Sequence, residues 1–376
     1  MNTPNIIQTQ SVLKAPPVED LSLVLGFKIL PPTSESSQPF FGIWLLDLSK
    51  SMEDNNKIDA AKESLKEQVE RLPKGTIFNL VSFGNPVQVH LKGIEINKHN
   101  KREITRAIDD LTPFGSTPLH AGLKKAFNIL EEYKGNLETQ KIILVGDGQP
   151  DFGCSREDVN NPQFKGYIKY AKKSRDLGAS IDSIGVGEEH NVLLMYQFAV
   201  QSTGKYIFAD NAPQLKSKLS IATNQITKIL YSNPTMTIEP VAGTCNVFDC
   251  IQYSPTTIRY PFEKIGKNWK AWLRSFEAGD TIEMMVKIQT HLNISSLQQG
   301  KSNQILKIKF NFGQNLETTL PVNVHLVQNP KEAKINKNML NKFKRINSKA
   351  DEIDDCTIKG DAQGTIMVQK DETQKH

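Results

Sequence analysis

Short apolar runs alternate with helical patterns between about residues 40 and 230. A continuous apolar run such as FFGIWLLDL is typical of a strand that is covered on both faces. The sequence KIDAAKESLKEQVERL, which follows it, places apolar or small side chains at helical spacing. Strand and helix alternate in this way several times, and this order predicts a mostly parallel sheet with helices on both faces. We expect this α/β domain to cover residues 39–232.

The same patterns locate the individual elements of this domain. After FFGIWLLDL, the expected parallel strands are GTIFNLVSFG, KIILVGDG, ASIDSIGVG and GKYIFAD, and VQVHLKG is expected as a hairpin partner at the sheet edge. Helices are expected in KIDAAKESLKEQVERL, NKREITRAIDDL, LHAGLKKAFNILEEY, a segment ending near SRDLG, NVLLMYQFAVQS, and from Ala212 to about Leu230.

The pattern changes after Asn233-Pro234. Apolar and polar residues alternate in six short segments with turn signals between them, which predicts an all-β antiparallel sandwich or partial barrel over residues 233–330. SLVLGFKILPP, within residues 1–38, alternates in the same way and has no place in the parallel sheet. We expect it to join the β module, so that the α/β domain is an insertion.

Residues 331–376 are polar and basic. Ile335, Met339, Phe343 and Ile346 recur at helical spacing, which predicts a basic amphipathic helix. The helix could dock on a partner or an anionic surface, or pack on its own sandwich. Its basic residues are Lys331, Lys334, Lys337, Lys342, Lys344, Arg345 and Lys349. The final DAQGTIMVQKDETQKH is expected to be a flexible tail.

Composition narrows the class of protein. The chain has 376 residues and a formal net charge of +5, which is too mild to indicate a nucleic-acid binder. The first twenty residues lack the features of a signal peptide, and the longest apolar runs are too short to cross a bilayer. Four cysteines spread along the chain do not form a disulfide framework, although Cys245 and Cys250 could pair in an exported protein. We therefore expect a cytoplasmic protein.

Oxygen-bearing side chains gather where strands of the α/β domain are expected to end. Asp47, Ser49 and Ser51 follow the first parallel strand, and Asp147 ends KIILVGDG. Thr117, in FGSTPLHAG, precedes a helix. Ligands of open α/β sheets bind at the carboxyl edge of the strands, where the strand order reverses. We expect all five side chains to reach this edge.

Three hydroxyls and two carboxylates suit a hard divalent ion. Mg²⁺ prefers six oxygen ligands and usually keeps some of its waters. Serine and threonine are neutral ligands, so the ion retains positive charge for an acidic group on another molecule. No histidine or cysteine pattern near these motifs favours zinc.

The ordered set D-x-S-x-S, S-T-P and D-G resembles the von Willebrand factor A (vWA) family with its metal-ion-dependent adhesion site (MIDAS). The resemblance covers about residues 40–230. It implies a Rossmann-like, doubly wound domain that binds Mg²⁺ or Mn²⁺ through Asp47, Ser49, Ser51, Thr117 and Asp147, and a partner's Asp or Glu that completes the metal shell. Lys50 and Gly146 depart from common family residues without removing a ligand. The Lys50 ammonium could weaken metal binding or hold an acidic partner.

Several other residues allow two interpretations each. Asp151 could orient a water at the ion or cap its loop. His120 could act at the site or be a surface or helix-packing histidine. Trp269 and Trp272, flanked by lysines, could contact a nucleic acid or glycan. Alternatively, one tryptophan fills the sandwich core and the other covers it.

The sequence does not favour an enzyme. It has no phosphate-binding G-x-x-x-x-G-K-[ST] loop, no G-x-S-x-G elbow and no H-E-x-x-H motif. A phosphotransferase with Asp47 as nucleophile is the strongest enzymatic alternative, but Ser49 stands where haloacid-dehalogenase-like sites usually carry a second acid. We therefore predict a metal-dependent protein-interaction module. The alternatives are a metal-dependent hydrolase or phosphotransferase and a scaffold with a vestigial site.

Overall fold

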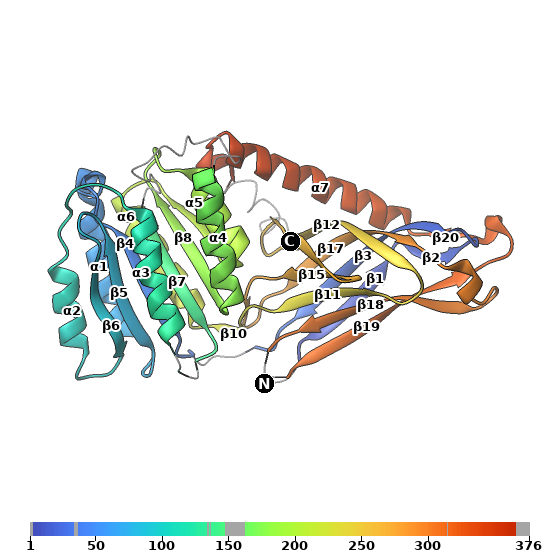
Figure 1. Cartoon of the computed structure of the whole chain (residues 1–376), viewed down its shortest axis with the longest axis horizontal. Coiled ribbons are helices and arrows are strands. Elements are labelled where there is room, and N and C mark those ends of the chain that lie inside the picture. The colour runs from blue at the N-terminus through green and yellow to red at the C-terminus, as the bar shows by residue number, and fades with distance from the viewer. Residues whose placement is uncertain are drawn as a thin grey trace. The chain divides into compact units, whose positions relative to one another are not determined.

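The computed structural model describes residues 3–33, 37–133, 135, 137–146, 162–313 and 315–365. These residues divide into two units (Figure 1). One, the α/β unit, comprises described residues from 37–232 and 355–365. The other, the β unit, comprises described residues from 3–33 and 233–354.

A six-stranded sheet forms the centre of the α/β unit. All neighbouring strands are parallel except β6, which pairs antiparallel with β5 at the edge. In spatial order the strands are β6 (Gln88–Glu95), β5 (Ile77–Phe83), β4 (Phe41–Asp47), β7 (Gln140–Gly146), β8 (Ala179–Val186) and β9 (Tyr206–Ala209). The predicted parallel sheet and its antiparallel edge strand are thus confirmed.

Helices cover both faces of this sheet, as Figure 1 shows. One face carries α1 (Lys57–Arg71), α2 (Lys101–Asp109) and α6 (Ala212–Ile226). The other carries α3 (Leu119–Glu132), α4 (Pro162–Asp176) and α5 (Val192–Ser202). Because helices lie on both sides, every residue of β4 is buried, as its continuous apolar sequence predicts.

Strand order reverses beside β4. From β4 the chain passes to β5 and β6 on one side, and then returns to β7 on the other side. In doubly wound sheets such a reversal opens a crevice at the carboxyl ends of the two central strands. The end of β4 at Asp47 therefore lies at this switch point.

The β unit contains two sheets of mainly antiparallel strands. The five-stranded sheet has the order β1 (Asn5–Gln10), β3 (Asp20–Leu30), β17 (Ile282–His291), β12 (Thr244–Ser254) and β13 (Ile258–Arg259). The seven-stranded sheet has the order β14 (Phe262–Ile265), β15 (Asn268–Trp272), β11 (Thr235–Pro240), β18 (Ser302–Asn311), β19 (Glu317–Leu326), β2 (Val12–Ala15) and β20 (Lys334–Ile335). A further short strand of this unit is β16 (Phe276–Glu277), and another, β10 (Ile229–Tyr231), belongs to the α/β unit.

Strands from the amino terminus pair with strands that follow the α/β unit in sequence. Strand β3 lies between β1 and β17 and is antiparallel to both. The two sheets meet through aromatic side chains: the ring centroids of Phe27 and Phe310 lie 5.2 Å apart in an edge-to-face arrangement. Pairs of this geometry add to the stability that burial of the rings provides.

Helix α7 (Lys337–Ile358) packs an apolar stripe on the five-stranded sheet. Met339, Phe343 and Ile346 lie in a buried cluster with Val24 and Met285 of that sheet. The sequence left two alternatives for this helix, docking on a partner or packing on its own sandwich. In the structure its apolar face packs on its own β unit.

The carboxyl-terminal region differs from the sequence prediction in two places. Ile335 is not part of the helix; it lies in β20, half exposed, and pairs with Val12 of β2. The expected flexible tail is wrong for its first residues, because 362–365 are helical and Ala362 and Thr365 are buried. Residues 366–376 lie outside the described residues.

Helix α6 ends four residues earlier than expected. It stops at Ile226, and the sequence up to Leu230 continues into β10. Among the described residues, no helix is both long and apolar enough to span a membrane.

Cys245 and Cys250 are buried free thiols on one strand, β12. Five residues of extended chain separate their backbones by about 16 Å, and a disulfide requires Cα atoms within about 7 Å. A bridge between these two cysteines is therefore excluded. Burial raises the pKa of the Cys245 thiol to about 11, which keeps it protonated and unreactive at neutral pH.

Candidate functional site

Asp47 ends β4 as a buried carboxylate. Its Oδ1 accepts a hydrogen bond from the backbone N–H of Ser49, with a donor–acceptor distance of 2.8 Å. An aspartate that accepts from the N–H two residues later stabilises a tight turn. This turn holds the backbone of Ser49 against the Asp47 carboxylate.

The two serine hydroxyls are neighbours. Ser49 Oγ and Ser51 Oγ lie 3.0 Å apart where η1 (Lys50–Met52) begins. Adjacent oxygens around an octahedral Mg²⁺ with bonds of about 2.0–2.1 Å would lie about 2.9 Å apart. The hydroxyl separation therefore suits two adjacent positions in the shell of a hard divalent ion.

The loop that carries Thr117 is tied to the end of β4 by backbone hydrogen bonds. Phe114 N–H donates to Leu48 O at 2.7 Å, and Lys50 N–H donates to Gly115 O at 3.2 Å. Thr117 itself is buried directly before α3. The structure thus brings the segments of Asp47, Ser49, Ser51 and Thr117 together at one edge of the sheet.

The loop after β5 joins the same arrangement. Leu48 N–H donates to Phe83 O at 2.9 Å, and Asn85 N–H donates to Phe114 O at 3.0 Å. Gly84 permits this close approach, because a Cβ there would lie only 2.9 Å from Phe114 O and 3.0 Å from Leu48 O. Three chain segments therefore meet backbone to backbone beside the candidate ligands.

Strand β7 ends against the Asp47 side chain. A Cβ on Gly146 would lie 2.6 Å from Asp47 Cβ and 2.8 Å from Asp47 Oδ2. This contact gives a physical reason for the glycine that departs from the family pattern. Asp147, the residue after Gly146, and Asp151 lie outside the described residues.

Two lysines lie near the candidate ligands. The Lys50 side chain is exposed. Lys57, the first residue of α1, was not singled out by the sequence, and its Nζ donates to Ser51 O at 3.4 Å. The same ammonium would lie 3.3 Å from a Cβ on Gly187, in the loop after β8. No local sequence pattern predicts this position of Lys57, because its ammonium lies between the loop of Ser51 and the loop of Gly187, which are distant in sequence.

His120 agrees with the interpretation of a surface histidine that helps pack helices. It is exposed, and its Nε2 lies 3.1 Å from the hydroxyl of Tyr170 on α4. The rings of His120 and Tyr170 are edge to face with centroids 5.2 Å apart.

The two tryptophans of β15 are both half-buried, so neither lies fully in the core as expected for one of them. Trp269 Nε1 donates to Cys245 O at 2.9 Å, and Lys264 Nζ lies 5.6 Å from its ring centroid. Trp272 has Lys270 Nζ 4.9 Å from its ring centroid. Each ring is thus paired with a lysine of its own sheet through a cation–π contact.

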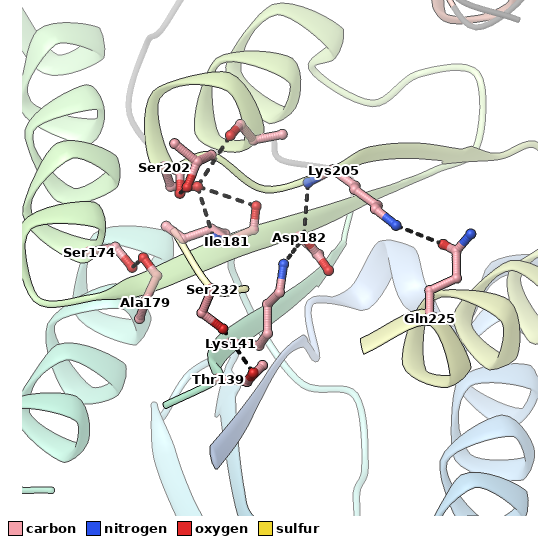
Figure 2. A network of polar contacts seen from close by, with 12 residues as sticks. Thr139, Lys141, Ser174, Ala179, Ile181, Asp182, Ser202, Lys205, Gln225 and Ser232 are labelled. Atoms are coloured by element: carbon pink, nitrogen blue, oxygen red, sulfur yellow. Dashed lines mark hydrogen bonds and ion pairs between the residues drawn. The ribbon is translucent and has the colours of Figure 1, made fainter. Parts of the chain in front are cut away.

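Sequence reasoning missed a buried ion pair in the α/β unit, drawn in Figure 2. Lys141 Nζ and Asp182 Oδ1 lie 3.0 Å apart, and both side chains are at most 3% exposed. Asp182 Oδ1 also accepts from Lys205 N–H at 2.9 Å. Lys141 is in register with Gly42, about 16 Å along β4 from Asp47. The pair therefore lies away from the candidate site and has a structural role.

Among the described residues, no group of three or more His, Cys, Asp or Glu side chains could hold a metal ion. The described donors at the end of β4 and before α3 are one carboxylate and three hydroxyls, and oxygen ligands of this kind are the ones that hard divalent cations prefer.

Comparison with known proteins agrees with this fold. The chain is 28% identical over 187 residues to the uncharacterized protein YfbK of Escherichia coli K12; the match covers 49% of this chain and 31% of that protein. The chain thus spans about a third of the length of this curated relative.

Two solved structures are similar over both units. A von Willebrand factor type A protein from Catenulispora acidiphila superposes with a TM-score of 0.74 at 15% identity, covering 96% of this chain and 84% of that one. The ArnB paralog VWA2 from Sulfolobus acidocaldarius gives a TM-score of 0.63 at 15% identity, covering 98% and 88% of the two chains. At these identities the similarity concerns the fold.

The sequence itself matches a family over the segment that contains β4, β5, α3 and β7. Residues 43–149 match the family described as von Willebrand factor type A domain. Domains of this family commonly mediate metal-dependent protein interactions. The family match and the observed topology together show that the chain contains a von Willebrand factor type A domain.

Proposed function

We propose that this protein is a non-enzymatic, metal-dependent protein-interaction module. Asp47, Ser49, Ser51 and Thr117 would hold Mg²⁺ or Mn²⁺. Asp147 is assigned to the same set from its place directly after Gly146. The observation that carries the proposal is the pair of serine hydroxyls 3.0 Å apart beside a buried carboxylate, at the switch point of the sheet.

The partner would supply the remaining ligand. When bound, the ion supplies a positive centre with an open coordination position. Because Ser49, Ser51 and Thr117 are neutral, they add no negative charge beyond that of the aspartates, and the ion can still attract an acidic group. An Asp or Glu of a partner protein is the group that best satisfies such a centre. The exposed ammonium of Lys50 adds attraction for an acidic partner, and this attraction weakens as salt rises.

The same carboxylate could in principle act as a nucleophile, but the residues around it favour binding. Ser49 occupies the place of the second acid that a dehalogenase-like phosphotransferase would use. The Asp47 Oδ1 atom is also engaged by Ser49 N–H in the turn. The β unit, as a sandwich module, and the exposed Lys344 and Arg345 of α7 would add contacts to the partner. The proposed location is the cytoplasm, as the sequence leads us to expect.

The metal part of the proposal is tested by thermal unfolding with Mg²⁺ alone. An ion that binds the folded state at 100 times its Kd stabilises that state by about 2.7 kcal/mol. We expect Mg²⁺ to raise Tm in the natural protein and not in Asp47→Ala. Ser116→Ala, in the same loop as Thr117 but exposed, is the matched control and should keep the shift.

The interaction part is tested by selecting random peptides displayed on phage in the presence of Mg²⁺ and eluting them with EDTA. We expect the eluted peptides to be enriched in Asp or Glu, and Asp47→Ala to yield no such enrichment. Peptides that bind equally well in excess EDTA would contradict the mechanism. Metal-dependent hydrolysis of a simple phosphoester, lost in Ser49→Ala, would instead support the enzymatic alternative.

A further inference from the structure

A large aromatic side chain is exposed at the rim of the candidate metal site. Phe114 is 69% exposed, more than any other exposed large hydrophobic residue in the described part of the chain. It lies in the loop before α3, three residues ahead of Thr117. Single exposed apolar residues are common on protein surfaces, so the exposure needs a second observation before it indicates a function.

The second observation is that the backbone of Phe114 is fixed on both sides. Its N–H donates to Leu48 O at 2.7 Å, and its carbonyl accepts from Asn85 N–H at 3.0 Å. The next residue, Gly115, accepts from Lys50 N–H at 3.2 Å. The exposure of the ring therefore comes from a loop with a defined conformation.

The loop is closely packed against the segments beneath it. A Cβ on Gly115 would lie 2.8 Å from Asn85 Cβ, and Gly115 adopts φ +81°, which L side chains rarely adopt. A Cβ on Gly84 would lie 2.9 Å from Phe114 O. The three segments therefore touch backbone to backbone, which leaves the loop little freedom to move.

The hydrogen bonds also place the backbone of Phe114 next to the candidate ligands. Phe114 is bonded to Leu48, whose next residue is the candidate ligand Ser49, and Gly115 is bonded to Lys50 between the two serines. The rim of the site thus carries an aromatic ring and an exposed ammonium. Aromatic residues are enriched in protein interfaces, where rigid rings contribute large contact areas.

We propose that Phe114 is an anchor that selects partner segments in which the Asp or Glu at the metal has an apolar side chain within two residues. This inference rests on the proposed function of the site. In an extended segment, side chains two residues apart lie on the same side, about 7 Å apart. Such a segment can present its acid to the ion and its apolar side chain to Phe114 together.

The test compares peptides selected in Mg²⁺ with synthetic variants of the same peptides. In one series the apolar neighbour of the acid is kept, and in the other it is replaced by serine. We expect Phe114→Ala to weaken binding of the first series about tenfold and to leave the second series unchanged. Phe114→Tyr should restore most of the affinity. Phe248→Ala, which removes a ring that is 64% exposed in the β unit, is the matched control and should change neither series.

Separate outcomes distinguish this inference from the function on which it rests. If the natural protein binds peptides only with Mg²⁺ but Phe114→Ala affects both series equally, the anchor is wrong and the metal-dependent interaction stands. If Phe114→Ala also loses the Tm shift produced by Mg²⁺, the residue supports the loop and is not an anchor. If the natural protein shows no EDTA-sensitive binding, the proposed function and the anchor both fail.

Discussion

At the scale of single residues, Gly146 shows how tightly the candidate site is packed. Its Cα lies so close to Asp47 that an added methyl group would come within 2.6 Å of Asp47 Cβ. Both residues are the buried last residues of neighbouring strands, so neither backbone can move freely. A glycine is required here by the neighbouring side chain and not by an unusual φ.

We predict that Gly146→Ala lowers the free energy of unfolding by about 1–3 kcal/mol, because overpacking a buried site forces the neighbours to shift. It should also reduce the Tm shift produced by Mg²⁺, since Asp47 is the group displaced. Gly166→Ala is the control, because a Cβ at that helical position meets nothing within 4 Å. The control should be neutral or stabilising by up to about 1 kcal/mol. Thermal unfolding with and without Mg²⁺ measures both effects.

The Lys141–Asp182 pair gives a second prediction at this scale. Lys141→Met would leave the Asp182 carboxylate buried without its ammonium partner, and breaking a buried ion pair costs about 3–5 kcal/mol. The double variant Lys141→Met with Asp182→Asn removes both charges and keeps an acceptor for Lys205 N–H. It should recover most of the lost stability in urea unfolding. A single variant as stable as the natural protein would contradict a role for the pair.

At the scale of elements, α7 is held to the β unit in two ways. Its apolar stripe covers the five-stranded sheet, and Gly26 of β3 leaves space for the tip of Met339. Near its other end, Asp351 and Asp354 both pair with Arg259 of β13, which also pairs with Asp249 of β12. Burial raises the pKa of Asp249 and of Asp354, although Arg259 opposes the rise.

We predict that Phe343→Ala destabilises the protein by about 3–5 kcal/mol, the usual cost of removing a buried phenylalanine ring. The neighbouring Arg345 is exposed, and Arg345→Ala should change stability by no more than about 0.5 kcal/mol. Urea unfolding of the two variants compares how much the buried and the exposed face of α7 contribute to the free energy of unfolding. Equal effects would mean that the apolar face of α7 does not contribute to stability.

At the scale of the whole molecule, the β unit is assembled from segments on both sides of the α/β unit in sequence. β3 is a central strand, because β1 and β17 are hydrogen-bonded to its two edges. It also supplies Phe27, whose ring contacts Phe310 of the other sheet. Removing β3 would therefore expose a long edge of β17 and open the space between the sheets.

We predict that residues 1–33 joined to 233–354 through a flexible glycine–serine linker fold on their own and unfold cooperatively on heating. Residues 233–354 alone should not fold, since they lack the central strand. Circular dichroism of the two shortened chains distinguishes these cases. A cooperative transition in residues 233–354 alone would show that β3 is dispensable.

Much of the α/β unit follows from local pattern. Continuous apolar runs such as the one at β4 predict buried strands, since a strand covered on both faces has no polar side. Helical spacing predicts α1 through α6. The predicted end of α6 was too late, because the apolar residues Ile229 and Leu230 fit a helical pattern as well as a strand pattern. Asp47, Ser49 and Ser51 could be singled out because they follow directly on a strand that was easy to recognise.

The sequence by itself thus determined the order and type of most elements of the α/β unit and the chemistry of the candidate ligands, since both depend on near neighbours in the chain. Only the tertiary structure decided which distant residues meet. Backbone hydrogen bonds connect Phe114 to Leu48 and Asn85. The buried ammonium of Lys141 pairs with Asp182, 41 residues away in sequence, and Gly146 packs against Asp47. These contacts are made by backbone atoms or between neighbouring strands, so they cannot be predicted from the spacing of residues along the chain.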